Sequence, residues 1–459
     1  MDQGPRSLHR RFFLAELLSC AGLFAAGLMI NLTLVACAAA QGWLTGEEAS
    51  VAFKDVVFLP LRLQHCRFDT NLGGHVIFAL ACALHPDPGL FYGRETKAVL
   101  LALAGPLVFL VARRLGLSRA ASLLSAFCLL VFPGFAAFSW IAIEPGLELL
   151  YGGLALYLAL GRSIWTWPLA GLLLGLGLLV YGGGVAFVPP VLALLAWRVW
   201  NEPDRRHVAS AVAALGLFGV ILKAPSFWWL NTSHSYRGGG TLELAGAPTL
   251  FLRMLYECFY KAHSYYFFSA SPALGGVLIM PLLAAGLYAS GRKPWTWWPL
   301  WLLAAGSISL YCIAAQPTGV RRSIALVFVA SLFLGLLYDT VASARRWPKA
   351  KALALAAWLI LVLGFQTTLT ARAYRDGSLS LPHDFDWIDG DMKVLLDRSQ
   401  VDTRTKIAVL GLEQPVRAMC LLHMLPPRHP EKTAALFSRA EIRDYYLTHE
   451  SEQDRQESR

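Results

Sequence analysis

Charged residues are scarce in this chain. They make up 15% of its 459 residues, whereas a soluble domain carries about 25%. The mean hydropathy is +0.50. A water-soluble protein of this composition would lack the polar groups that must cover its surface. We therefore exclude a soluble globular fold for most of the chain and expect the lipid bilayer to be its solvent.

Cysteine is also scarce, and it follows no pattern. None of the eight cysteines stands in a CxxC pair or at a His/Cys ligand spacing, so the sequence predicts neither a disulfide framework nor a metal site. Half of them, Cys20, Cys37, Cys128 and Cys312, lie inside apolar segments. The N-terminal apolar stretch, about 12–40, is too long for the core of a cleavable signal peptide.

Long apolar runs dominate the chain instead. A helix needs about 20 apolar residues to cross a bilayer. Eleven segments meet this requirement approximately: 13–39, 97–113, 119–138, 144–161, 164–180, 184–199, 208–223, 275–290, 295–315, 322–341 and 351–371. Segment 73–85 is apolar but short, and we predict an interfacial or re-entrant helix there.

Basic residues orient these spans. With the N-terminus inside, every predicted inside loop is basic, and the short outside connections near 139–144 and 181–184 hold no Lys or Arg. This is the positive-inside pattern. It explains much of the net charge of +10, so nucleic acid is not expected as a partner. The inside basic residues are Arg6, Arg10, Arg11, Arg113, Arg114, Arg119, Arg162, Arg198, Arg205, Arg206, Arg292, Lys293, Arg345, Arg346, Lys349 and Lys351.

The sequence therefore predicts an all-α polytopic membrane protein with about eleven transmembrane helices. The transmembrane domain covers 1–371, and its two large outer loops are 40–96, with interfacial helices, and 224–274. Residues 372–459 form a small extracytoplasmic C-terminal region. It is α/β-like, because 406–411 has the pattern of a strand, and its polar end is expected to be disordered.

Acidic residues on the outer side are the first candidates for chemistry. Glu47 and Glu48 follow the first span closely, and Glu144 stands at the outer end of another span, just before Pro145. An ionisable residue at such a position often faces a polar cavity. The alternatives are plain solvation at the interface and, for Glu144, the favourable dipole of a helix N-terminus. Glu148, one turn further along, should lie deeper and needs a partner.

Four segments carry a resemblance to a known family. TGEEASVAFKDVV, FDTNLGGHVIFALACAL, VFPGFAAFSWIAIEPGLELLYGGLALYLAL and QPTGVRRSIALVFVASLFL resemble segments of the GT-C glycosyltransferases, in the branch of the protein O-mannosyltransferases and bacterial aminoarabinose transferases. The resemblance covers about 40–370 in layout. Two features depart from it: Glu47 stands where the family usually has Asp, and Asn71-Leu72-Gly73-Gly74 replaces a Pro-Pro segment.

The resemblance implies transfer of a sugar from a polyprenyl-phosphate-linked donor to an acceptor hydroxyl on the outer face. The reaction would be an inverting displacement with a carboxylate base. Glu47 is the first candidate, followed by Glu48, Asp69 and Glu144. The lipid phosphate needs fixed cations, and Arg321-Arg322 stands out because it breaks the charge rule, although snorkelling to headgroups is the alternative. The phosphate-binding candidates are Arg62, Arg67, Arg237, Lys261, His263, Arg321 and Arg322.

The expected partners are the polyprenyl-phosphate-sugar donor, a lipid, glycan or protein acceptor, and membrane lipids. No cofactor is expected, and a divalent cation is left open. We expect the bacterial inner (plasma) membrane, with a cytoplasmic N-terminus and an extracytoplasmic C-terminus. Three other readings remain: a transporter or flippase of lipid-linked glycans, a polysaccharide polymerase or ligase, and a non-catalytic assembly partner.

Overall fold

The computed structural model describes the transmembrane region with gaps. It covers residues 5–39, 90–141, 145–161, 163–202, 204–228, 247–261, 263–264, 267–313, 324–344 and 348–376, together with single residues in 74–80 and 441–448. The predicted strand at 406–411 and most of the predicted interfacial helix at 73–85 lie outside these ranges.

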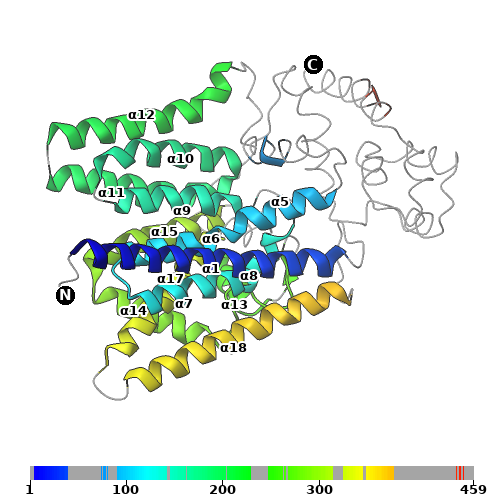
Figure 1. Ribbon diagram of the computed structural model, residues 1–459. Coiled ribbons are helices and arrows are strands. Elements are labelled where there is room, and N and C mark those ends of the chain that lie inside the picture. Colours follow the sequence, from blue (N-terminus) through cyan, green and yellow to red (C-terminus); the bar gives the residue numbers. More distant parts are fainter. Residues whose placement is uncertain are drawn as a thin grey trace.

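The described chain is a bundle of helices (Figure 1). In chain order they are α1 (Pro5–Ala39), α5 (Leu90–Ala102), α6 (Ala104–Arg114), α7 (Arg119–Val131), α8 (Pro133–Ser139), α9 (Leu147–Leu160), the 3-10 turn η1 (Ile164–Thr166), α10 (Trp167–Val180), the 3-10 turn η2 (Gly182–Phe187), α11 (Val188–Asn201), α12 (Arg205–Trp228), α13 (Ala247–Phe259), α14 (Met280–Gly291), α15 (Pro294–Ile313), α17 (Ala325–Ala342) and α18 (Pro348–Arg375). Two short strands, β1 (His263–Ser264) and β2 (Phe267–Phe268), pair antiparallel, with His263 opposite Phe268.

Six helical segments of the described chain are long and apolar enough to cross a membrane. They are Phe13–Ala38, Gly93–Arg114, Gly182–Asn201, Arg205–Leu222, Ala325–Ala342 and Pro348–Arg375, and a bent helix pair brings the number to seven. The apolar helices Leu147–Leu160 and Ile164–Val180 are shorter. The all-α polytopic architecture is thus confirmed, whereas the count of eleven stays a prediction.

The bent pair differs from the single span expected at 119–138. α7 and α8 meet at an angle of 59°, because Phe132 between them is extended (φ −65°, ψ 129°) and Pro133 opens α8. A residue before proline is pushed out of the helical region by the proline ring, and proline itself suits the first helical position. The sequence therefore ends one helix and starts another inside one apolar run.

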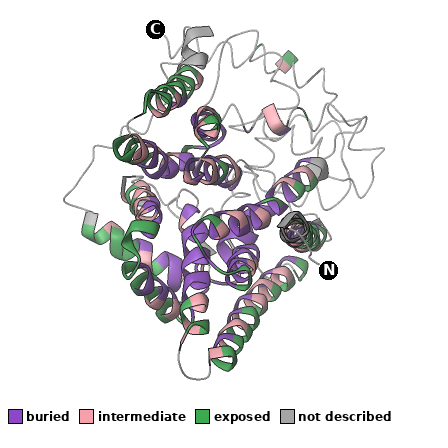
Figure 2. Ribbon diagram, turned by 60° about the vertical axis from the view of Figure 1, so that its left-hand side comes forward, coloured by how far each residue is buried: buried purple, intermediate pink, exposed green. Residues whose placement is uncertain are grey.

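Buried residues concentrate in the central helices of the bundle, and the outer helices carry most of the exposed ones (Figure 2). Large apolar residues are among those exposed, such as Val212 and Val220 of α12. Nearly every residue from Ala325 to Leu337 of α17 is buried, whereas only 11% of Arg205–Leu222 in α12 is buried. Small residues allow close crossings, as in membrane helix packing generally. Gly171 of α10 lies against the carbonyl oxygen of Ala214 in α12, where a Cβ would clash. Exposed apolar faces such as that of α12 suit contact with lipid.

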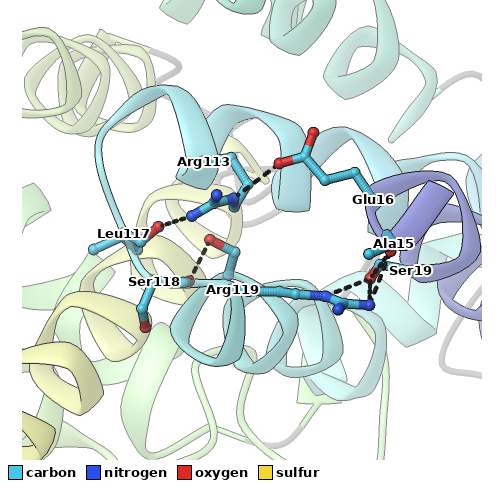
Figure 3. A network of polar contacts seen from close by, with 8 residues as sticks. Ala15, Glu16, Ser19, Arg113, Leu117, Ser118 and Arg119 are labelled. Atoms are coloured by element: carbon cyan, nitrogen blue, oxygen red, sulfur yellow. Dashed lines mark hydrogen bonds and ion pairs between the residues drawn. The ribbon is translucent and has the colours of Figure 1, made fainter. Parts of the chain in front are cut away.

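One end of the bundle carries the N-terminus and a polar network that ties α1 to the α6–α7 turn (Figure 3). Arg113 Nε donates to Glu16 Oε1 at 3.3 Å and Arg113 Nη1 to the Leu117 carbonyl at 2.6 Å. Arg119 Nη2 donates to Ser19 Oγ and to the Ala15 carbonyl, both at 2.8 Å. We call this the basic end.

Other basic residues and tryptophans gather at the basic end. The α11–α12 turn, with Arg205, lies there, as does the start of α18 (Figure 1). The Trp197 and Trp298 rings, 6.4 Å apart, bring the α14–α15 turn to α11. Trp200 and Trp295 are 85% and 80% exposed, as expected of an aromatic belt at a membrane surface. Trp297, two residues after Trp295, is instead buried at 1% exposure and packs near Phe333. Which side of the membrane this end faces stays a prediction.

Candidate functional site

Most of the residues predicted to act on substrate lie outside the described part of the chain. These are Glu47, Glu48, Asp69 and Glu144 among the acids and Arg62, Arg67, Arg237, Arg321 and Arg322 among the cations. Lys261 is described: it is half-buried, and its backbone N–H donates to the Tyr256 carbonyl at 3.0 Å where α13 ends. His263 belongs to strand β1. Their roles in binding donor phosphate stay predictions.

The described residues instead bring together a buried polar cluster at the end opposite the basic end. We define it as Arg94 and Lys97 of α5, Trp140 after α8, Glu148 of α9 and Tyr374 of α18, all of which are at most 1% exposed. α5 is tied to the late part of α1, because Asn31 Nδ2 donates to the Ala98 carbonyl at 2.9 Å. The cluster therefore lies far along α1 from the network at Glu16.

Lys97 links α5 to the loop before α9. Its ammonium group donates to the Pro145 carbonyl oxygen at 2.7 Å, and both residues are buried. A hydrogen bond from a charged donor is short and about twice as strong as one between neutral groups. Because Pro145 directly follows Glu144 in the sequence, this bond fixes the chain beside a predicted acidic site residue.

Aromatic rings surround the second cation of the cluster. The Arg94 guanidinium carbon lies 4.9 Å from the centre of the Trp140 ring, within the range of a cation–π contact. Trp140 meets Tyr374 edge to face, with ring centres 4.8 Å apart. Three parts of the chain, α5, the residue that follows α8, and α18, are thus joined around one buried charge.

Glu148 has the depth and the partner that the sequence required. It is fully buried, and its Oε2 accepts a hydrogen bond from the Gly146 N–H at 2.6 Å. Gly146 has φ +98°, a conformation that suits glycine, so the carboxylate can reach back over the start of α9. Its Oε1 lies against η2, where a Cβ on Gly183 would come within 2.8 Å.

Two further segments approach this cluster. A Cβ on Gly146 would lie 3.8 Å from Ile324 Cδ1, so the chain two residues after Arg322 packs beside the start of α9. From the other side, Ser269 Oγ and Thr370 Oγ1 are 3.2 Å apart. This contact joins the end of the β1–β2 segment to α18, one turn before Tyr374.

The predicted second outer loop contains an amphipathic helix, α13. Cys258 and Phe259 are buried, whereas Tyr256 and Tyr260 are 57% and 60% exposed. Their rings are stacked, with centres 6.1 Å apart. Arg253 Nε donates to the buried Glu257 carboxylate at 3.1 Å.

Sequence reasoning missed Arg94 and Lys97. The signal was present, because two cations one turn apart at the head of an apolar run are costly in a membrane and usually functional. The span was predicted to begin at residue 97, which placed Lys97 at its first position and Arg94 in the preceding loop, and neither residue was singled out. Among the described residues no group of three or more His, Cys, Asp or Glu is placed to hold a metal ion.

Comparison with known proteins finds a match for the segment that holds four of the five cluster residues. No curated protein matches the chain. Residues 89–233, about a third of the chain, match the family model described as dolichyl-phosphate-mannose-protein mannosyltransferase. The match begins at α5, with Arg94 and Lys97, includes Trp140 and Glu148, and runs to the end of α12. Over these residues the chain therefore matches a family of the GT-C superfamily, in agreement with the predicted resemblance.

Proposed function

We propose that this protein transfers a sugar from a polyprenyl-phosphate-linked donor to an acceptor hydroxyl, at the end of the bundle opposite the basic end. The observation that carries the proposal is the family match over 89–233, which contains the buried Lys97 and the loop that it holds. By the charge rule, the opposite end is the outer face of the membrane. Mannose is the first sugar to test, because the family is defined by a mannosyl donor.

The reaction needs a general base for the acceptor hydroxyl and a leaving group that takes up the negative charge. The acceptor oxygen attacks the anomeric carbon, the bond from that carbon to the phosphate oxygen breaks, and polyprenyl phosphate leaves. The acceptor proton passes to a carboxylate, for which Glu47 is our first assignment. It follows α1, which ends at Ala39, at the same end of the bundle as the buried polar cluster.

The leaving phosphate needs cations, and Arg321 and Arg322 are our first assignment. The packing of Ile324 beside Gly146 supports it, because this contact brings the chain after Arg322 to the loop that follows Glu144. Guanidinium groups match phosphate oxygens in geometry and charge. Glu144 directly precedes Pro145, and the Pro145 carbonyl accepts the hydrogen bond from Lys97.

The test is sugar transfer by the purified full-length protein in lipid nanodiscs, with polyprenyl-phosphate mannose as donor. Glu47→Gln keeps the side-chain volume and removes the base. It should bind donor normally and lose about 10²- to 10⁴-fold in turnover. Glu48→Gln is the matched control and should lose less. Arg321→Ala combined with Arg322→Ala should weaken donor binding, and the assay with EDTA tests whether a divalent cation takes part.

The pattern of losses discriminates between assignments. An inactive Glu48→Gln beside an active Glu47→Gln would move the base by one residue. If both variants are active, the base moves to Asp69 or Glu144. If Asp69→Asn and Glu144→Gln are active as well, the transferase proposal fails, and binding or assembly becomes the better account.

A further inference from the structure

A second site is suggested by an apolar groove between α11 and α12, near the basic end. Leu192, Leu195 and Val199 of α11 line one side, and Val208, Val212 and Leu215 of α12 line the other. Its volume is about 640 Å³, which lies within the range of about 300–1,000 Å³ for small-molecule sites. The groove shares no residue with the buried polar cluster.

The groove exists because α12 packs against α10 and only loosely against α11. Gly171 of α10 packs closely against Ala214 of α12, and Gly175 of α10 packs closely against Ile221 of α12. The face of α12 that carries Val212 and Leu215 is left 61% and 49% exposed. In a membrane, a hydrocarbon chain fills such a face without cost.

Length and charge indicate which hydrocarbon fits. The stripe from Val208 to Leu215 rises about 10 Å along the helix, compared with about 15 Å for half of the bilayer core. The same stripe continues one turn back to Arg205, since residues three and seven apart share a helix face. Arg205 and Arg206 are exposed, and the exposed Trp200 lines the groove, at the height expected of the headgroup region.

The turn between the helices also holds two carboxylates, Glu202 and Asp204. Glu202 Oε2 contacts His207 Nε2 at 3.2 Å. Arg198 is directed elsewhere, because its Nη2 donates to the Leu160 carbonyl at 2.7 Å. Arg205 and Arg206 therefore supply the cations at the mouth of the groove, beside the exposed Asp204.

We propose that this groove binds one anionic diacyl phospholipid, with an acyl chain between α11 and α12 and its phosphate at Arg205 and Arg206. This site goes beyond the proposed sugar transfer, since it lies at the opposite end of the bundle from the buried polar cluster. A phospholipid of the surrounding leaflet fits better than the polyprenyl donor, which we assign to that other end.

The experiment measures lipid retention by native mass spectrometry of the purified full-length protein, titrated with phosphatidylglycerol or phosphatidylcholine. Phosphatidylglycerol should bind more tightly. Arg205→Ala combined with Arg206→Ala should weaken it about 30-fold, since each basic residue near an anionic surface contributes about fivefold. Phosphatidylcholine binding should change little. The matched control, Arg292→Ala with Lys293→Ala, removes two exposed cations of the α14–α15 turn and should not change phosphatidylglycerol binding.

A second variant tests the groove itself. Val212→Trp fills it and should lower phosphatidylglycerol binding with both arginines in place. Val220→Trp, at an exposed α12 position outside the groove, should not. Equal retention of the two phospholipids, an equal loss in the control pair, or displacement of phosphatidylglycerol by equimolar polyprenyl phosphate would each overturn the proposal.

Discussion

Replacing Lys97 by methionine tests whether the buried polar cluster serves the reaction. The change keeps an unbranched apolar stem and removes the ammonium group that donates to the Pro145 carbonyl at 2.7 Å. A hydrogen bond to a charged group contributes about 1.5–3 kcal/mol. The carbonyl of the buried Pro145 also loses this donor. We therefore expect the loop before α9 to be less rigidly positioned.

The size of the effect follows from that energy. If the whole of this hydrogen-bond energy holds the Glu144 segment in place, its loss lowers the population of molecules with the correct geometry by about 10- to 150-fold. The loss should appear mainly in kcat and less in KM, because donor binding depends on other groups. Lys97→Arg keeps a donor at this position and should recover part of the activity.

The assay is mannosyl transfer in nanodiscs, with the melting temperature of each variant measured in parallel. Lys293→Met is the matched control, because Lys293 is exposed at the basic end, and it should change neither quantity. A kcat within twofold of the unaltered protein for Lys97→Met would refute the positioning role. So would a lower melting temperature with full activity in the folded fraction, which would indicate a purely structural lysine.

Three further predictions concern local packing, a thiol and topology. Gly183→Ala places a methyl group 2.8 Å from Glu148 Oε1 and 3.1 Å from the Tyr181 ring, so it should lower both melting temperature and activity, whereas Gly182→Ala, which meets nothing within 4 Å, should be neutral. Burial raises the pKa of the Cys258 thiol to about 12. Because the thiolate is the reactive form, a maleimide should leave Cys258 unmodified at pH 8 until the protein is denatured. Modification of Cys258 in the native protein would contradict its buried placement. In intact cells, single cysteines introduced at Gly238 and after Arg375 should be labelled from outside, and those at Asp204 and Arg346 should not; labelling at Asp204 would rule out the predicted orientation.

Hydropathy predicted the helices well where one apolar run makes one helix. The segments expected at 13–39, 322–341 and 351–371 match α1, α17 and α18 closely. It failed at Phe132-Pro133, where the run contains a turn, because an average over 18 or 20 residues does not register the backbone restriction that one proline imposes. It also cannot separate the buried Trp297 from the exposed Trp295 two residues earlier.

The candidate site was predictable only in part, for a different reason. Glu148 could be anticipated as a buried acid with a partner because its position relative to the helix start is local information. The contact between Lys97 and Pro145 joins residues 48 positions apart. It depends on how α5 packs against the start of α9, and no local pattern determines that. Glu47, Glu48, Asp69, Arg321 and Arg322 lie outside the described residues, so their predicted roles still rest on the resemblance.

The two ends of the bundle use their cations in different ways, and this difference bears on function. At the basic end Arg205 and Arg206 are exposed, as expected of residues that face headgroups and follow the charge rule. At the other end, which is the outer face in the predicted orientation, Arg94 and Lys97 stand against that rule and are fully buried. Burying a charge is costly, so neither solvation nor snorkelling accounts for them. The hydrogen bond to the Pro145 carbonyl gives Lys97 a polar partner at this depth, within the segment that matches the mannosyltransferase family.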